Sequence, residues 1–183
     1  MKKQSTVLYV LRLALTLLLI TGVVAAALAG VNGVTEPIID ALNARKTQDA
    51  IAQVLPGGGE ALHGFTDETG IVKAVYASDT GYAIQVAPAG FGGEIQMMVG
   101  VTKDGEVLGI SIISHTETAG LGAVAAAQTS AGESFRGQFA GQSGELAVSK
   151  DGGSIDALTG ATITSRAVTE GVNAALACAA NLG

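Results

Sequence analysis

The longest hydrophobic run of the chain lies near the N-terminus, at residues 13–31. It contains no charge, and Thr16 and Thr21 are its only polar side chains. A helix of roughly 20 apolar residues, rising about 1.5 Å per residue, crosses the hydrocarbon core of a bilayer. The pattern therefore predicts a single transmembrane helix.

Charged residues flank this run asymmetrically. Lys2, Lys3 and Arg12 precede it, and Glu36 and Asp40 follow it. Because cytoplasmic flanks are enriched in basic residues, we expect a single-pass protein of the cell (inner) membrane with a cytoplasmic N-terminus. Everything after about residue 34 is then expected on the outer face.

A cleaved signal peptide is the alternative to a retained anchor. Ala27, Leu28 and Ala29 form an A-x-A cleavage pattern behind a basic N-terminus. The uncharged run is longer than the roughly 7–15 residues of a usual signal-peptide core, which favours the anchor. Both interpretations place the same domain outside the membrane.

After the anchor, the pattern predicts a helix over 36–54. Thr35, Glu36 and Pro37 are the residue types of a helix start, and Pro56 with the glycines after it is a stop signal. We expect this helix to connect the anchor to a single outer domain. The expected segments are the N-terminus and anchor at 1–34, the linking helix at 35–60 and the extracytoplasmic domain at 61–183.

Beyond the linking helix, short alternating runs predict strands. Asp104-Gly105 is a strong hairpin signal between the last two of them. A short helix over 119–129 and a final helix over 165–181 complete an α+β domain with an antiparallel sheet and flanking helices. The four predicted strands span 71–77, 81–87, 94–102 and 107–114.

Composition and charge exclude several classes of function. The net charge is −6, and after Arg12 seven basic residues face sixteen acidic ones, which argues against nucleic-acid binding. The single cysteine, Cys178, excludes an internal disulfide and is expected to be a small buried residue. His63 and His115, the two histidines, lie far apart in sequence, so no metal site is expected.

The stretch SHTETAGLG follows the last predicted strand and allows two interpretations. It can be a strand-to-helix loop in which Thr118 caps the helix and the glycines give backbone freedom. Alternatively, a planar ligand lies on Gly120 and Leu121, with Glu117 and His115 as polar contacts.

The stretch DALTGATITS, which begins at Asp156, is also open to two interpretations. It can be a simple helix start, with Thr164 or Ser165 as the N-cap. Alternatively, Thr162 is an attachment point, since its glycine and alanine neighbours leave it sterically open. A helix N-terminus just after it offers free N–H groups and a positive dipole end, which would stabilise a phosphate ester.

Three stretches together carry a family resemblance. They are GYAIQVAPAGFGGEIQMMVGV, HTETAGLG and DALTGATITS. In the first of them, Met97 and Met98 are expected in the core or at an interface and not as cofactor ligands. The second is similar to an H-x-E-T-P-G-L-G box and the third to the D-x-x-[ST]-G-A-T flavinylation motif. The chain thus resembles the G subunit of the Rnf ion-translocating oxidoreductase, a relative of the C subunit of the sodium-pumping NADH:quinone reductase. One departure is Ala119, which stands where that family has proline.

The resemblance implies FMN bound covalently by a phosphoester to Thr162. A flavin transferase that uses FAD as donor and a magnesium ion would recognise the motif and attach the FMN. Two groups of residues follow from the same resemblance. The cofactor-binding group is Thr162, Thr118, Gly120, Leu121, Glu117, Thr159, Gly160 and Ala161, and the group read by the transferase is Asp156, Thr159, Gly160, Ala161 and Thr162.

By the same resemblance, the protein is an electron-carrier subunit of a translocase. Its partners would be the other membrane subunits of the Rnf complex, which couples ferredoxin:NAD oxidoreduction to Na⁺ or H⁺ transport. Two alternatives stay open. One is a membrane-anchored FMN carrier outside that complex, for example in extracellular electron transfer, and the other is a non-redox exported binding domain.

Overall fold

The computed structural model describes residues 2–65, 67 and 69–182, which form two compact units, one up to residue 45 and the other from residue 46 onward. Helix α1 (Lys2–Val54) runs from one unit into the other without a break at residue 35. The predicted helix start there is wrong, because the Thr35 hydroxyl donates to the carbonyl of Val31 at 2.6 Å. Thr35 thus satisfies a carbonyl within the helix, and Pro37 lies inside it.

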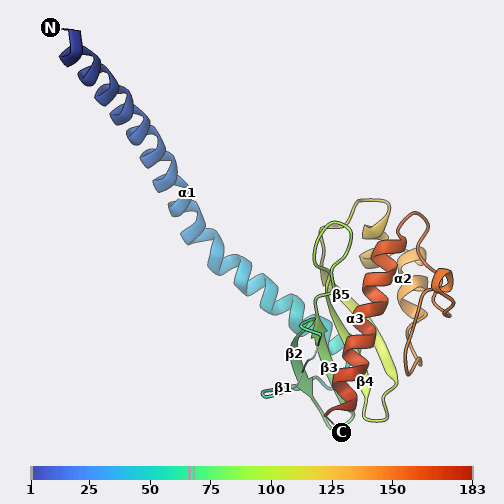
Figure 1. Ribbon diagram of the computed structural model, residues 1–183. Coiled ribbons are helices and arrows are strands. Elements are labelled where there is room, and N and C mark those ends of the chain that lie inside the picture. Colours follow the sequence, from blue (N-terminus) through green and yellow to red (C-terminus); the bar gives the residue numbers. More distant parts are fainter. Residues whose placement is uncertain (1, 66, 68, 183) are drawn as a thin grey trace. The chain divides into compact units, whose positions relative to one another are not determined.

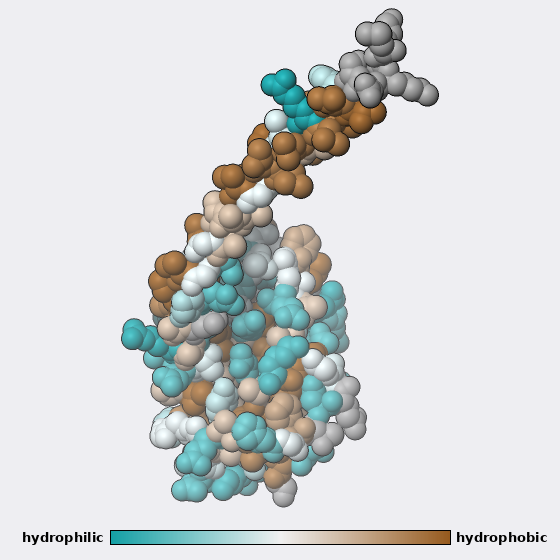
Figure 2. All heavy atoms as spheres, turned by 90° about the vertical axis from the view of Figure 1, so that its left-hand side faces the viewer, coloured by the Kyte–Doolittle hydropathy of each residue, from teal (hydrophilic) through white to brown (hydrophobic). Residues whose placement is uncertain are grey.

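The first unit consists of α1 up to residue 45, and its apolar side chains face outward. On the face seen in Figure 2, brown side chains gather along much of this stretch. Leu17, Leu18 and Ile20 are each more than 60% exposed. Among the described residues, this is the one helix long and apolar enough to cross a membrane. The predicted span is therefore present as an uninterrupted apolar helix.

The second unit is built on a five-stranded antiparallel meander in the order β1-β2-β3-β4-β5. The four predicted strands are confirmed, and β1, which pairs Ala61 with Tyr76, was not predicted. Gly105 has φ +81° in the predicted β4–β5 turn, a conformation that favours glycine. The strands are β1 (Glu60–Leu62), β2 (Val72–Ala77), β3 (Gly81–Val86), β4 (Gln96–Thr102) and β5 (Val107–Ser114).

Both faces of the sheet are covered. Helix α3 (Thr162–Ala180) lies across one face (Figure 1), where its Val168 and Val172 join the main core with Met97. The end of α1 packs on the other face, where Val54 and the next residue, Leu55, form a second core cluster with Met98. Met97 and Met98 are both fully buried, so their predicted place in the core is confirmed. The architecture is α+β, as predicted.

The predicted helix over 119–129 is wrong. The chain instead forms a 3₁₀ turn, η1 (Gly122–Ala126), and then a separate helix, α2 (Ser130–Gly137). The guanidinium group of Arg136 donates to the carbonyls of Ala125 and Ala127, at 2.6 and 3.1 Å. In a continuous helix these carbonyls would instead accept from backbone N–H groups four residues later. The Thr129 hydroxyl caps α2 by accepting from the N–H of Gly132.

Helix α3 begins three residues earlier than predicted. Thr162 is its first residue and Ala161 stands at the N-cap, so neither Thr164 nor Ser165 caps the helix. The Ser165 hydroxyl is fully buried, where it donates to the Ala161 carbonyl and accepts from the N–H of Leu158. This hydroxyl holds the preceding loop against the helix.

Candidate functional site

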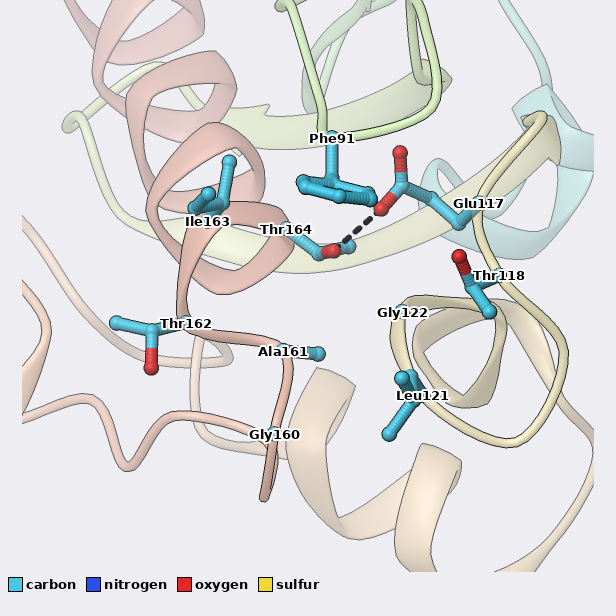
Figure 3. A pocket seen from close by; sticks show the side chains of 10 residues that line it. All are labelled: Phe91, Glu117, Thr118, Leu121, Gly122, Gly160, Ala161, Thr162, Ile163 and Thr164. Carbon is cyan, nitrogen blue, oxygen red and sulfur yellow. Dashed lines mark hydrogen bonds between the residues drawn. The ribbon is translucent and has the colours of Figure 1, made fainter.

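Three segments that are distant in sequence meet around one cavity. They are the loop between β3 and β4, the loop after β5 and the beginning of α3 (Figure 3). The cavity has a volume of about 300 Å³, at the lower end of the usual range for ligand pockets. It is lined by Phe91, Glu117, Thr118, Leu121, Gly122, Gly160, Ala161, Thr162, Ile163 and Thr164.

Glu117 connects the three segments. It is buried, with 8% of its surface exposed. One carboxylate oxygen accepts from the N–H of Gly92 at 2.8 Å, and the other accepts from the Thr164 hydroxyl. Figure 3 draws the carboxylate and this hydroxyl pointing toward each other. Both oxygens of a buried carboxylate are therefore satisfied within the protein.

Glycines make room for the Glu117 carboxylate. A Cβ at Gly90 would lie 2.5 Å from one of its oxygens, and a Cβ at Gly122 would lie 2.5 Å from the other. A Cβ at Gly122 would also overlap the Thr164 hydroxyl. These glycines thus allow close approach of two loops to one buried side chain.

The Glu117 loop is held by two further hydrogen bonds. The Thr116 hydroxyl donates to the Gly92 carbonyl at 2.9 Å, and the N–H of Glu117 donates to Nδ1 of His115 at 3.2 Å. His115 therefore contacts the backbone of the loop. The carbonyl of Thr118 accepts from the N–H groups of Leu121 and Ala123. In the described structure no side chain caps η1, and Leu121 stands at its N-cap, so the interpretation of Thr118 as a side-chain cap is wrong there.

Thr162 lies half-buried at the first position of α3. In Figure 3 its side chain points away from the Glu117–Thr164 pair. Its hydroxyl oxygen accepts from Nζ of Lys150 at 2.9 Å. The helix start places oriented N–H groups beside this hydroxyl, and Lys150 adds a full positive charge, so the surroundings favour an anionic group.

A second cation near Thr162 is already paired. Arg166, one turn along α3, donates two hydrogen bonds of 2.6 Å to the carboxylate of Asp151. The hydrogen bond from Arg166 lowers the pKa of Asp151 and raises the pKa of the guanidinium. Lys150 and Asp151 are neighbours in the 3₁₀ turn η2 (Ser149–Asp151), so this pair fixes the turn against α3.

The remaining candidate residues differ in whether they line the cavity. Gly120 (φ +75°) and Thr159 are exposed and, within the described chain, do not line it. Gly160 lines it with φ +74°, where a Cβ would approach Leu121 to 3.0 Å. Asp156 is exposed, and its backbone exchanges two hydrogen bonds with the Gln138 side chain.

Apolar side chains surround the mouth of the cavity. Phe91, Leu121 and Ile163 are 67%, 44% and 51% exposed although all three line it. Phe91, Ile163 and Lys150 were not singled out from the sequence as site residues. The sequence does offer a signal for Phe91, because it is an aromatic residue in a glycine-rich loop of a chain with only 4% aromatic residues. Ile163 and Lys150 join the site only through the fold.

These residues fit a flavin mononucleotide. The exposed apolar side chains offer contact to a planar aromatic ring, and no side chain larger than glycine fits at Gly122, where a Cβ would overlap the Thr164 hydroxyl. Thr162 with Lys150 forms a polar end suited to a phosphate. The arrangement has an apolar part and an anion-favouring part adjacent to each other.

Comparison with known proteins identifies the class. Residues 90–177 match the family model described as "FMN-binding domain". This range contains all the residues that line the cavity. Within the described residues, the chain therefore combines an FMN-binding domain with one candidate membrane span.

Whole-chain relatives are more specific. The chain is 35% identical to the G subunit of the Na(+)-translocating ferredoxin:NAD(+) oxidoreductase complex of Acetobacterium woodii, over 94% of this chain and 93% of the relative. It is 29% identical to the G subunit of the ion-translocating oxidoreductase complex of Methanosarcina acetivorans, over 90% and 92% of the two chains. The chain belongs to the family of G subunits of the Rnf ion-translocating oxidoreductase complexes, and the resemblance found in the sequence is confirmed.

The relatives differ in the ion for which they are named. The G subunit of the proton-translocating ferredoxin:NAD(+) oxidoreductase complex of Clostridium ljungdahlii is 45% identical over 57% of this chain and 58% of the relative. The Acetobacterium relative is named for sodium. One family thus includes subunits of complexes with different coupling ions.

Proposed function

We propose that this chain carries FMN through a phosphoester on Thr162 and acts as an electron-carrier subunit of an ion-translocating ferredoxin:NAD oxidoreductase complex. The observation that carries the proposal is the position of Thr162. Its hydroxyl lies at the first residue of α3, in contact with a lysine ammonium and at the edge of the FMN-domain cavity.

Each part of the site has a separate role in this proposal. Bound FMN supplies the redox chemistry, accepting and donating electrons, while the protein supplies attachment and orientation. Thr162 holds the phosphate, and Phe91, Leu121 and Thr118 contact the ring system. Glu117 positions the loops and does not react, because both of its oxygens accept hydrogen bonds from the protein.

The exposed part of the motif suits recognition by another protein. Asp156, Thr159 and Gly160 are exposed around Thr162. We assign these residues to recognition by a flavin transferase that uses FAD and a magnesium ion. Ala161 is buried against the cavity, so its small side chain serves the fold of the motif.

The proposed location follows from the anchor and its flanking charges. Lys2, Lys3 and Arg12 favour a cytoplasmic N-terminus, and the FMN domain then lies on the outer face. The other membrane subunits of the complex are its electron-transfer partners. The coupling ion, Na⁺ or H⁺, crosses the membrane elsewhere in the complex, because the apolar run of this anchor contains no carboxylate.

Intact-mass measurement tests the attachment. The full chain is produced with a flavin transferase and compared with Thr162→Ala and with Thr80→Ala, whose hydroxyl lies in the exposed β2–β3 turn. We expect a gain of one FMN less one water in the parent and in Thr80→Ala, and no gain in Thr162→Ala. An unmodified parent, or a modified Thr162→Ala, would contradict the covalent assignment.

Copurification tests the place of the protein in the complex. We expect tagged, flavin-loaded protein to copurify from its own membranes with other subunits of a ferredoxin:NAD oxidoreductase. A loaded protein that is isolated alone would instead favour a carrier outside the complex. A protein without flavin in the presence of the transferase would favour a non-redox binding domain.

A further inference from the structure

Lys150 is the one residue outside the flavinylation motif whose charged group contacts the proposed attachment atom within the described structure. Its Nζ lies 2.9 Å from Oγ1 of Thr162. Arg166, the other nearby cation, is engaged by both oxygens of Asp151. An ammonium is therefore directed at this hydroxyl, and the guanidinium is held to one side.

Backbone hydrogen bonds hold the turn that carries Lys150 in place. The N–H of Ser149 donates to the carbonyl of Ile155 at 2.7 Å, and the N–H groups of Asp151 and Gly153 both donate to the carbonyl of Val148. Val148 and Ile155 are buried in the main core. The turn that carries Lys150 is thus tied to the core, although the lysine side chain itself is exposed.

Neighbouring glycines keep the turn in this shape. Gly152 has φ +88°, a left-handed conformation that favours glycine. A Cβ at Gly153 would overlap the carbonyl of Ala147. The backbone geometry that presents Lys150 to α3 is therefore specified by residues that, in the described structure, do not line the cavity.

We propose that Lys150 takes part in the flavinylation of Thr162, so that the acceptor protein itself contributes a charge to the reaction. This inference rests on the proposed attachment of FMN to Thr162. In the transfer, Thr162 Oγ1 forms a bond to the FMN-side phosphorus of FAD. The bond from that phosphorus to the oxygen of the AMP phosphate breaks, AMP leaves, and the threonine proton passes to a base of the transferase.

The position of Lys150 matches the charge that develops in this step. In phosphoryl transfer, the developing negative charge is spread over the three equatorial oxygens of the phosphorus, which come next to the attacking oxygen as the new bond forms. An ammonium that already contacts the attacking oxygen stabilises this charge without reorganising. Afterwards the phosphodiester retains one negative charge, and Lys150 pairs with it beside the N-terminus of α3.

Flavinylation kinetics test the first part of the inference. The full chain in detergent is incubated with a flavin transferase, FAD and Mg²⁺, and the gain in mass is followed over time. We expect Lys150→Met to lower the kcat of the transferase with this chain as acceptor by about tenfold or more. Removing one preorganised donor from an active site lowers kcat by about 100- to 1000-fold. We expect Lys150→Arg to restore most of the rate.

Controls separate chemistry from docking and folding. Lys103→Met removes an exposed lysine from the β4–β5 turn and should leave kcat unchanged. A rise in KM with unchanged kcat for Lys150→Met would overturn the inference, because the lysine would then serve transferase docking alone. An unmodified parent chain would instead contradict the attachment to Thr162, so the two failures are distinguishable.

A second measurement uses loaded protein without turnover. Lys150→Met is loaded by long incubation, and its ³¹P NMR resonance is compared with those of the parent and of Lys103→Met. We expect the phosphodiester resonance to shift in Lys150→Met alone. Identical resonances in all three proteins would overturn the pairing of Lys150 with the bound phosphate.

Discussion

Glu117 joins three segments that lie far apart in sequence, and its effect should be measurable in stability. Glu117→Ala would leave the Gly92 N–H and the buried Thr164 hydroxyl without their acceptor. We expect the free energy of unfolding to fall by about 2–4 kcal/mol, because buried groups that lose a charged partner bear the desolvation cost. Urea unfolding of the detergent-solubilised chain, followed by circular dichroism, measures the change.

Two further variants test the Glu117 interpretation. Glu117→Gln keeps one oxygen as an acceptor and should lose less stability than Glu117→Ala. The exposed Glu106, replaced by Ala, should change stability by no more than about 0.5 kcal/mol. If Glu117→Ala were as stable as Glu106→Ala, the three segments would not depend on this carboxylate.

Gly122 provides a second test at the residue scale. A Cβ there would displace Glu117 or Thr164, since it would lie 2.5 Å from the carboxylate and overlap the hydroxyl. We expect Gly122→Ala to lower the free energy of unfolding by about 1–3 kcal/mol and to weaken retention of the flavin ring. Differential scanning calorimetry and flavin fluorescence report these two effects.

Gly109 is the matched control for Gly122. It also lies in regular structure without a positive φ, and a Cβ there would meet nothing within 4 Å. Gly109→Ala should therefore keep both the stability and the flavin environment of the parent. Equal effects of the two substitutions would mean that Gly122 is not needed for close packing around Glu117.

Among the elements, the turn η2 and the N-terminal part of α3 are joined by the ion pair of Asp151 and Arg166. The hydrogen bond from Arg166 lowers the pKa of Asp151 below its ordinary value of 3.8. The pair therefore stabilises the folded chain above pH 3.8, and this contribution is lost as the pH falls through the lower, folded-state pKa. Both groups are exposed, so the effect is small.

Thermal unfolding across pH tests this linkage. We expect Asp151→Asn to have a slightly lower Tm than the parent at about pH 7, with the difference shrinking as the pH is lowered toward about 2. Asp49→Asn, in the exposed part of α1, serves as the carboxylate control. A Tm difference that stayed constant down to the lowest pH would show that the charge of Asp151 is not what matters.

The elements differ in how far the sequence determines them. The strands were predictable because alternation and the turn at Gly105 are local signals, and β1 was missed because three residues are too few to show a period. The helix at 119–129 failed because Arg136, from a later segment, takes the carbonyls of Ala125 and Ala127. Such contacts between distant segments leave no local pattern.

The site also combines local signals, which can be recognised in the sequence, with contacts between distant segments, which cannot. Thr162 and Glu117 lie in recognisable motifs, so their stretches could be selected from the sequence. The Thr164 hydroxyl was interpreted as a cap because Ser and Thr favour helix starts, yet it bonds to Glu117 from 47 positions away. Lys150 reaches Thr162 only after η2 folds against α3.

For the whole molecule, the sequence makes a prediction about orientation that thiol labelling can test. Cys178 is 3% exposed, and burial raises the pKa of its thiol, with the Asp67 carboxylate adding to the rise. Because the thiolate is the reactive form, the parent chain should react little with a thiol reagent. Labelling of cysteines introduced on either side of the anchor can therefore be measured with little background labelling of Cys178.

Ser143→Cys, at an exposed position of the FMN domain, and Ser5→Cys, before the anchor, are the two informative variants. With a membrane-impermeant maleimide on intact cells, we expect labelling of Ser143→Cys alone, and labelling of both after the membrane is permeabilised. The reverse pattern on intact cells would contradict the outer location of the domain. A Ser5→Cys chain that is never labelled, with an intact mass that begins after Ala29, would mean that the apolar run is removed as a signal peptide. The FMN domain would then depend on its partners, and not on its own helix, to stay at the membrane.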